Sequence, residues 1–309
     1  MASTSATLSQ LMQTYYDRLF IDTAKHSLVF EQGAQMRPLP NGEGKIVNFL
    51  RYSPLAIITA QTTEGSNPAA VNLSATNVSA TVSEFGSYTS ISKLLKLTAI
   101  DSKMKGAVEV MAQNAGESRD QLVRTHAFAD KGTTQLAAGS AALTDVGVTD
   151  TMSSSEIRKA VRTLKVAKAQ KYDDGYFLGK IGPYCAYDLM GDDTWVNAHT
   201  YKDGMALYRG EIGRLHGVRF IETTNALETD NEGTSSADIM HTFIHGKNAF
   251  GVTDLEGDSK KVYIKNPGSN STDNPTDRFS TVGWMMSTVP VRLVSDWIIE
   301  IESGATSQS

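Results

Sequence analysis

The chain has 309 residues, a single cysteine, a net charge of −5 at pH 7 and a sequence pI near 5.7. This length is just above the size at which one hydrophobic core stops growing, so we expect one elaborated domain or two intertwined ones. One cysteine excludes an internal disulfide and a cysteine-rich zinc site, and the acidic balance argues against tight phosphate binding as the main task. No run approaches the roughly 18 apolar residues that span a bilayer. We therefore expect synthesis in a reducing cytoplasm and no membrane contact.

A helix and a long hairpin are predicted in the first part of the chain. An amphipathic helix at the N-terminus is indicated by apolar residues at helical spacing, Leu8, Leu11, Met12, Tyr15 and Leu19. Between Lys45 and about Tyr88, two segments rich in Val, Thr, Phe and Tyr flank the polar turn AQTTEGSNPAA, which predicts a two-stranded arm. An isolated hairpin is marginally stable in water. We therefore expect the arm to lie on a neighbouring subunit.

Two helices are predicted after the arm. Asp101 can cap the first, which runs to about His126 and has its apolar face at Met104, Val108, Met111, Ala115 and Leu122. The Ala/Gly/Thr-rich stretch that follows predicts a loop. A capping-box pattern from Ser153 to Glu156 opens the second helix. One face of this helix is apolar, with Ile157, Ala160, Val161, Leu164 and Ala167. The opposite face is basic, with Arg158, Lys159, Arg162, Lys165 and Lys168.

From Tyr176 onwards the pattern is mixed, which predicts an α+β fold for the whole chain. Strand-like runs are GYFLGKIG, GVRFIET, DIMHTFIHG and KVYIK, and CAYDLMGDDTW contains a helix-like piece. The C-terminal segment VRLVSDWIIEIES predicts one long strand. Its expected apolar face consists of Val291, Leu293, Trp297, Ile299 and Ile301.

His241 and His245 in HTFIH are the best-spaced candidates for metal ligands. Their apolar neighbours predict a strand, on which four residues span about 13 Å, too far for both to bind one ion at about 2 Å. No third ligand is evident, so we favour a structural role. The acidic turns YDDG (172–175) and MGDDTW (190–195) are typical of turn formers rather than of a magnesium site. We expect no metal and no cofactor.

No catalytic signature is evident, and we predict that the chain is not an enzyme. It lacks a phosphate-binding loop and a GxSxG elbow, and Cys185 lacks the flanks of a catalytic nucleophile. In GEIGRLHGVRFIETTNA, His216 has no Ser or Cys partner, which favours a structural role. We expect the charged residues of this stretch to be available for subunit contacts: Arg214, Arg219 and Glu222.

The basic helix face is the feature best suited to nucleic acid. The chain is acidic, however, and no aromatic residue is interleaved on that face. These features favour a solvated face or one that pairs with the acids of a neighbouring subunit.

Segments along nearly the whole chain resemble a single family. They are TLSQLMQTYYDRLFIDTA, FLRYSPL, TTEG, LTAID, IRKAVRTLKVAKA, CAYDLMGDDTWV, GEIGRLHGVRFIETTNA, GKNAFGVT, STVGW and IESG. Together they resemble the major capsid proteins of tailed bacteriophages with the HK97-like fold, in the subgroup found in schitovirus-type podoviruses. The stretch around His216 then belongs to a structural domain.

The resemblance implies a division of the chain into five parts. These are an N-terminal arm (1–43), an extended E-loop hairpin (44–90), a peripheral or P domain with the long spine helix (91–154), an axial or A domain with a central mixed sheet (155–280), and C-terminal strands that return to the P domain, with the tail (281–309).

The resemblance also implies a structural protein of the virion. It would assemble in the bacterial cytoplasm as hexamers and pentamers into an icosahedral head around double-stranded DNA, with loose DNA contact, portal and scaffold proteins as partners, and decoration proteins as further candidates. From their positions on the arm and the basic helix, we hypothesise that Arg51, Glu64, Arg158 and Arg162 make intersubunit contacts. The alternatives are a soluble metal-assisted hydrolase that uses His241, His245 and the Asp turns, and a tail or decoration protein that binds the shell.

Overall fold

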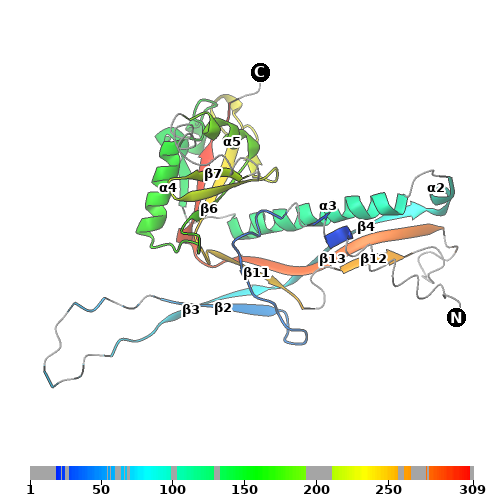
Figure 1. The fold of residues 1–309 in the computed structure, drawn as a ribbon, viewed down its shortest axis with the longest axis horizontal. Helices are drawn as coiled ribbons and strands as arrows, with labels where there is room; N and C mark the ends of the chain where they lie inside the picture. The colour runs from blue at the N-terminus through cyan, green and yellow to red at the C-terminus, as the bar shows by residue number, and fades with distance from the viewer. Residues whose placement is uncertain are drawn as a thin grey trace.

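The computed structural model describes most of the chain, namely residues 19–21, 23–24, 28–53, 55, 57–59, 64–65, 67, 70–98, 103–128, 133–192, 211–256, 261–265, 276 and 278–306. The predicted helix positions from Leu8 to Tyr15, the predicted cap at Asp101 and the second half of the MGDDTW turn lie outside the described residues. Figure 1 shows three parts: a long layer of helix and sheet, a second unit above one end of this layer, and a hairpin that projects from the same end.

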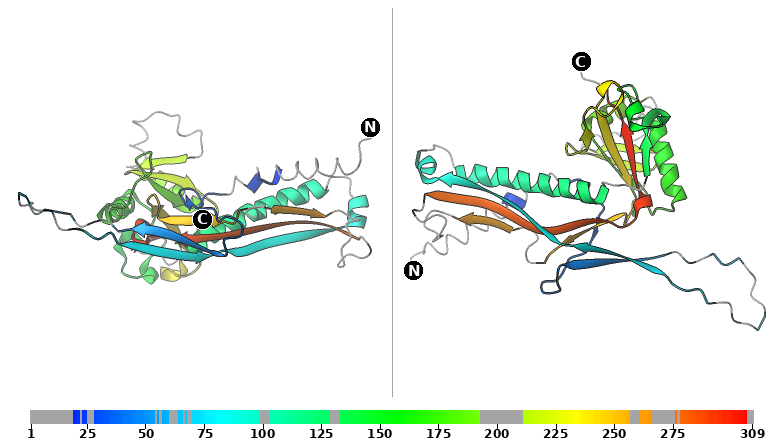
Figure 2. Two further views of the ribbon diagram at one scale, coloured as in Figure 1. Left: turned by 90° about the horizontal axis from the view of Figure 1, so that it is seen from below. Right: turned by 180° about the vertical axis from the view of Figure 1, so that it is seen from behind.

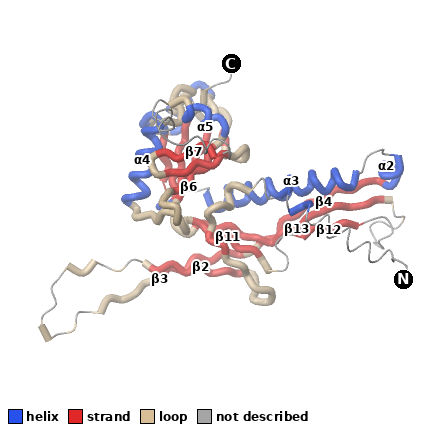
Figure 3. Tube along the Cα trace, viewed as in Figure 1, coloured by secondary structure: helices blue, strands red, loops and turns tan. Residues whose placement is uncertain are grey.

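The long layer pairs one helix with a five-stranded sheet. Helix α3 (Lys103–Val123) continues into a π-helical turn, Arg124–Phe128, and the short helix α2 (Lys93–Thr98) precedes it. The strands of the sheet are β1 (Gln35–Met36), β4 (Ser83–Ser92), β11 (Phe250–Asp254), β12 (Lys261–Lys265) and β13 (Phe279–Arg292). Figure 3 shows the strands running along the helix. The predicted apolar face of α3 packs on one face of the sheet, where Val108, Met111 and Ala115 meet Val282, Trp284 and Met286.

The second unit is built on a seven-stranded sheet in the order β5-β14-β10-β6-β8-β7, with β9 also paired to β10. Its strands are β5 (Thr133–Leu136), β6 (Phe177–Ile181), β7 (Glu211–Leu215), β8 (Val218–Glu222), β9 (Glu228–Thr229), β10 (Ile239–His245) and β14 (Ile298–Ser303). Helices α4 (Ser154–Val166) and α5 (Pro183–Met190) pack on it through one apolar cluster. The apolar positions predicted for α4 from Ile157 to Leu164 are buried, whereas Arg158, Arg162 and Lys165 are exposed.

The predicted arm forms from β2 (Ile46–Tyr52) and β3 (Ala75–Thr81), paired antiparallel from Ile46↔Thr81 to Tyr52↔Ala75. Beyond Thr81 the chain leaves the arm, because β4 pairs with β13 in the long layer. Both views in Figure 2 show the arm reaching past the two sheets. Near its base, Val47 and Phe49 are buried in a small apolar cluster.

The segment 28–36 joins the two sheet units through buried polar contacts. Asp120 Oδ1 on α3 accepts hydrogen bonds from the backbone N–H groups of Val29 and Phe30 at 2.8 and 2.5 Å. Lys180 Nζ on β6 donates a hydrogen bond to the carbonyl oxygen of Phe30. The Arg119 guanidinium binds both carboxylate oxygens of Glu31 and both of Asp254 at 2.8 to 2.9 Å. This segment is therefore fixed to α3, to β6 and to β11 at once.

Two predictions about the ends of elements were wrong. The capping box at Ser153 does not form, because the Ser153 side chain makes no cap hydrogen bond; instead the Asp192 carboxylate accepts from the Ser154 N–H at 2.9 Å. Residues 133–136, predicted as loop, form β5, which pairs in parallel with β14. In both cases the partner is distant in sequence, so local pattern gave no signal.

The prediction of one long C-terminal strand was also wrong. Strand β13 ends at Arg292, and the N–H groups of Leu293 and Val294 both donate to the Ala249 carbonyl oxygen, which turns the chain. After a 3₁₀ turn at Ser295–Trp297, β14 joins the seven-stranded sheet instead of the long layer. Strands β11 and β12 lie in the long layer. The expected boundaries 155–280 and 281–309 therefore do not coincide with the two sheets.

Candidate intersubunit surfaces

The arm carries apolar side chains that the described part of the chain leaves largely exposed. They are Ile46, Leu50, Tyr52, Leu55, Ile57, Ile58, Val71 and Leu73, of which Ile57 is 81% and Ile58 66% exposed. Exposed apolar patches of this kind mark protein interaction sites. Glu64 lies at the turn of the arm and is also exposed. This exposure is compatible with the hypothesis that Glu64 contacts a neighbouring subunit.

Arg51 lies at the base of the arm, exposed on β2, with its guanidinium carbon 5.7 Å from the centre of the Trp297 ring. A cation over an aromatic face at this distance contributes about 0.5–1 kcal/mol at an exposed site. A groove of about 400 Å³ lies beside this contact, lined by residues of the arm base and by Lys168, Gln170 and Trp297. Arg51 therefore has a partner within its own chain, which links the arm to the start of β14.

Arg158 and Arg162 lie one turn apart on the exposed face of α4. With Lys165, Val166 and His216 they line an open hollow of about 500 Å³. Among the described residues, neither arginine makes an ion pair. Lys159 on the same helix differs, because its ammonium lies 2.8 Å from Glu156.

An acidic cluster lies beside β9. Carboxylate oxygens of Glu228, Asp230 and Asp238 all lie within 4.8 Å of one another, and all three residues are exposed. Desolvation, followed by the charges of Asp230 and Asp238, raises the pKa of Glu228. Like charges this close destabilise one another, so a cation or a basic partner would be favoured here.

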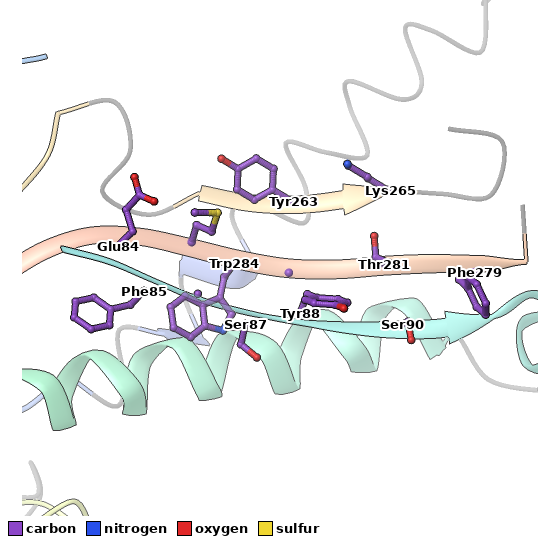
Figure 4. A pocket seen from close by; sticks show the side chains of 13 residues that line it. Glu84, Phe85, Ser87, Tyr88, Ser90, Tyr263, Lys265, Phe279, Thr281 and Trp284 are labelled. Atoms are coloured by element: carbon purple, nitrogen blue, oxygen red, sulfur yellow. The ribbon is translucent and has the colours of Figure 1, made fainter. Parts of the chain in front are cut away.

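The sheet face of the long layer that points away from α3 is hollowed between two tyrosines. Gly283 on β13 is paired with Tyr88 on β4 and with Tyr263 on β12, so the two rings flank a position without a side chain (Figure 4). The hollow measures about 850 Å³, and Tyr88 is 75% exposed. This surface could not be predicted from the sequence, because it depends on the register of three strands.

The two candidate histidine ligands lie on strand β10, as predicted, and have different surroundings. His241 Nδ1 lies 2.8 Å from Glu300 Oε1 and Nε2 lies 2.7 Å from Thr229 Oγ1. His245 Nδ1 lies 3.0 Å from the Tyr172 hydroxyl, and burial, with the charge of Lys180, moves the pKa of His245 well below its usual range. The strand geometry counts against one ion held by both.

Carboxylates missed by the sequence analysis do surround His241. One oxygen each of Glu300 and Glu302 and one nitrogen of His241 lie within 4.8 Å of one another, on the paired strands β10 and β14. This donor set could accept a divalent cation. Both ring nitrogens of His241 already lie at hydrogen-bond distance from protein atoms. The cluster of His241, Glu300 and Glu302 is therefore also explained without a metal, as a buried polar network between the two strands.

The stretch around His216 forms the β7–β8 hairpin. His216 adopts a left-handed backbone conformation at the turn, with φ of 48°, and its Nε2 lies 2.7 Å from Ser154 Oγ. Arg219 pairs with Asp174 at 3.2 Å, and Arg214 lies over the Tyr176 ring at 4.8 Å. Arg219 therefore has an ion-pair partner in its own chain, whereas Arg214 and Glu222 are exposed, and subunit contacts by these residues stay a prediction.

The remaining candidate groups are structural. Cys185 is buried beside Ser303, and burial raises the pKa of its thiol. In the first acidic turn, Asp174 accepts the Tyr176 N–H at 3.1 Å, as predicted for a turn former. Within the described residues, no helix combines the length and apolar character that crossing a membrane requires.

Lys180 is the most unusual of the buried groups. Its ammonium lies 4.4 Å from the centre of the Phe128 ring, 4.8 Å from Phe250 and 5.1 Å from Phe30, and burial lowers its pKa well below the usual value. Its hydrogen bond to the Phe30 carbonyl gives it a structural role at the junction of the two sheets.

Among the comparisons with known proteins, only the one with solved structures finds matches. No protein-family model matches the chain. No curated protein sequence matches it. Among solved structures, the capsid of Ralstonia phage GP4 matches with a TM-score of 0.71 and 12% identity over 91% of this chain and 89% of that chain.

Two further structures agree. The capsid of cyanophage Pam1 matches with a TM-score of 0.65 and 16% identity over 91% of this chain and 93% of that one. The head of the Helicobacter pylori bacteriophage KHP40 gives 0.65 and 13% over 90% and 88%. Each likeness spans about nine tenths of both chains. The chain has the α+β, HK97-like fold of phage capsid subunits, as its sequence predicted.

Proposed function

We propose that this chain is the major capsid protein of a tailed bacteriophage, which assembles from hexamers and pentamers into an icosahedral head around double-stranded DNA. The observation that carries the proposal is the arm: a hairpin that extends beyond both sheets and, among the residues that the structure describes, exposes eight large apolar side chains. In the described part of a single chain these side chains stay exposed, whereas a shell supplies a neighbour to every arm.

The parts of the chain are assigned by the same proposal. The long layer with α3 is the P domain and its spine helix, the seven-stranded unit is the A domain, the β2–β3 hairpin is the E-loop, and residues 1–43 form the N-terminal arm. Heterologous contacts that close into rings require each subunit to present different surfaces on different sides. The arm, the tyrosine hollow, the basic face of α4 and the acidic cluster are four such surfaces.

The proposal also names partners and location. The chain binds copies of itself, together with portal and scaffold proteins, and decoration proteins attach to the finished shell. It resides in the virion after assembly in the host cytoplasm, and it has a structural rather than an enzymatic role. Loose contact with packaged DNA agrees with the net charge of −5, because an acidic container does not hold its DNA tightly.

Electron microscopy of the expressed protein, with light scattering on the same sample, tests the proposal. Closed shells, or defined pentamers and hexamers, are the expected result, with scaffold protein co-expressed in a parallel sample. A uniform small oligomer in both samples would contradict the proposal and favour a tail or decoration protein. Stoichiometric metal in that oligomer, measured by elemental analysis, would favour the hydrolase alternative.

A further inference from the structure

We propose that the basic face of α4 in one subunit binds the acidic cluster beside β9 in the next copy of the chain. This inference rests on the proposed function and names one pair of surfaces that holds neighbouring A domains together. The residues of the basic face that we expect to make the contact are Arg158, Arg162 and Lys165. On the other side, Glu232 of the same loop adds to the acidic cluster of Glu228, Asp230 and Asp238.

The basic face has the character of an unoccupied contact. Its three cations are exposed and, among the described residues, make no ion pair. Val166 beside them is 77% exposed, which adds an apolar element to the hollow that they line. Lys159 shows that this helix can neutralise a cation locally, since it pairs with Glu156. Among the described residues the neighbouring three have no such local partner, and the proposal gives them one in the next copy of the chain.

The acidic cluster has the opposite character. Three carboxylates lie within 4.8 Å of one another, and Glu232 is exposed on the same loop. Across the described part of the chain, no basic side chain pairs with any of the four. Three negative charges held this close repel one another, and a cationic partner relieves that repulsion.

The fold keeps the two surfaces apart within one subunit. Lys165 and Val166 precede Ala167, whose carbonyl oxygen accepts from Trp297 Nε1 just before β14 begins. Glu228 is paired with Met240, which is paired in turn with Ser303 at the end of β14. The C-terminal end of the basic face, at Lys165, and the acidic cluster therefore lie toward opposite ends of β14, whereas the start of α4 lies at the same end as the cluster, because Thr151 bridges Gly304. Two different surfaces that attract each other between copies produce head-to-tail association, which forms a ring when the rotation between copies closes.

Exchanging the charges between the two surfaces tests the pairing. Arg158→Glu with Arg162→Glu gives one full-length variant, Glu228→Lys with Asp230→Lys gives a second, and the combination of all four restores the wild-type net charge. Each double reversal is expected to raise the protein concentration needed for assembly at least tenfold, and the combined variant to recover to within about threefold of wild type. Equal assembly of the double variants, or no recovery in a combined variant with a wild-type circular dichroism spectrum, would overturn the pairing.

Zero-length carbodiimide crosslinking of wild-type protein provides a second measurement that does not depend on how variants fold. Assembled particles should yield a peptide that joins Lys165 to the 228–238 loop, and dissociated subunits should not. Crosslinks elsewhere without this one would overturn the pairing. Loss of DNA retention without loss of assembly would show that the face binds DNA, and would overturn it as well.

These results separate the inference from the proposed function. If the wild type forms shells and the charge-reversal variants assemble equally well, the pairing is overturned and the proposed function stands. A wild type that forms neither assemblies nor the Lys165 crosslink would overturn both.

Discussion

Gly283 shows how one small residue shapes a surface. A Cβ atom built on Gly283 would lie 2.8 Å from the Tyr88 Cβ and 3.1 Å from the Ser87 carbonyl oxygen. The second of these neighbours is backbone of a paired strand, so it cannot move aside without disturbing the ladder. Gly283→Ala should therefore lower the free energy of unfolding of the unassembled subunit by about 1–3 kcal/mol. Urea denaturation followed by tryptophan fluorescence measures this change.

Gly106 provides the matched control. It lies near the start of α3 and is exposed, and nothing lies within 4 Å of an added Cβ. Replacing a helical glycine by alanine reduces the conformational freedom lost on folding, so Gly106→Ala should stabilise the subunit by about 0.5–1 kcal/mol. Equal and small effects at the two positions would show that β4 and β13 tolerate a side chain at Gly283.

The sequence predicted the position of some residues but not the neighbours of others. The strand position of His241 and His245 was predictable because the apolar residues Ile239, Phe243 and Ile244 surround them and Gly246 follows. The carboxylates of Glu300 and Glu302 beside His241 were not, since they come from a strand paired only in three dimensions. Arg158 and Arg162 were correctly expected on an exposed helix face, and their role between subunits stays a prediction.

At the scale of elements, the segment 28–36 depends on Arg119 of α3. This guanidinium is almost fully buried; burial works to lower its pKa, yet hydrogen bonds and charge from Glu31 and Asp254 raise the pKa above its ordinary value. Removing one partner of a buried ionic network leaves the others uncompensated, at a cost of about 3–5 kcal/mol. Arg119→Met should lower the free energy of unfolding by that amount, as measured by urea denaturation of the unassembled subunit.

Lys105 offers the comparison within the same helix. Its ammonium lies 3.8 Å from Glu109, and both side chains are about half exposed. Pairs of this kind contribute about 0.3–0.5 kcal/mol. Lys105→Ala should therefore leave the unfolding midpoint nearly unchanged. A similarly small loss for Arg119→Met would show that the segment 28–36 is held by the packing of Phe30 and not by its ion pairs.

Helices and strands were largely predictable where the spacing of apolar residues alone determines the element. The faces of α3 and α4 and the strands β6, β8, β10 and β12 follow from apolar spacing. The break between β13 and β14 was not predictable, because apolar residues keep strand spacing from Val291 to Ile301, and the turn between the strands is held by distant partners such as the Ala249 carbonyl oxygen. Asp192 as the cap of α4 likewise depends on tertiary contact.

At the scale of the whole molecule, the fold separates what stabilises a subunit from what joins subunits. The apolar clusters within the two sheet units and at the arm base are complete in one chain. The outer part of the arm has no such cluster among the described residues, since its apolar side chains are exposed. A residue in the first group should affect folding, and a residue in the second should affect assembly alone.

Substitutions on the arm test this separation. Ile57→Ser with Ile58→Ser should leave the unfolding free energy of the subunit within about 0.5 kcal/mol of wild type, because both side chains are exposed. Each loses about 1.5–3 kcal/mol of apolar burial once a neighbour covers it, so the concentration needed for assembly should rise at least tenfold, as light scattering measures. Phe49→Ser, on the same hairpin but 3% exposed, should instead lower subunit stability by about 3–5 kcal/mol. Unimpaired assembly of the Ile57/Ile58 variant would mean that shell contacts are made by other surfaces and that the arm serves another partner.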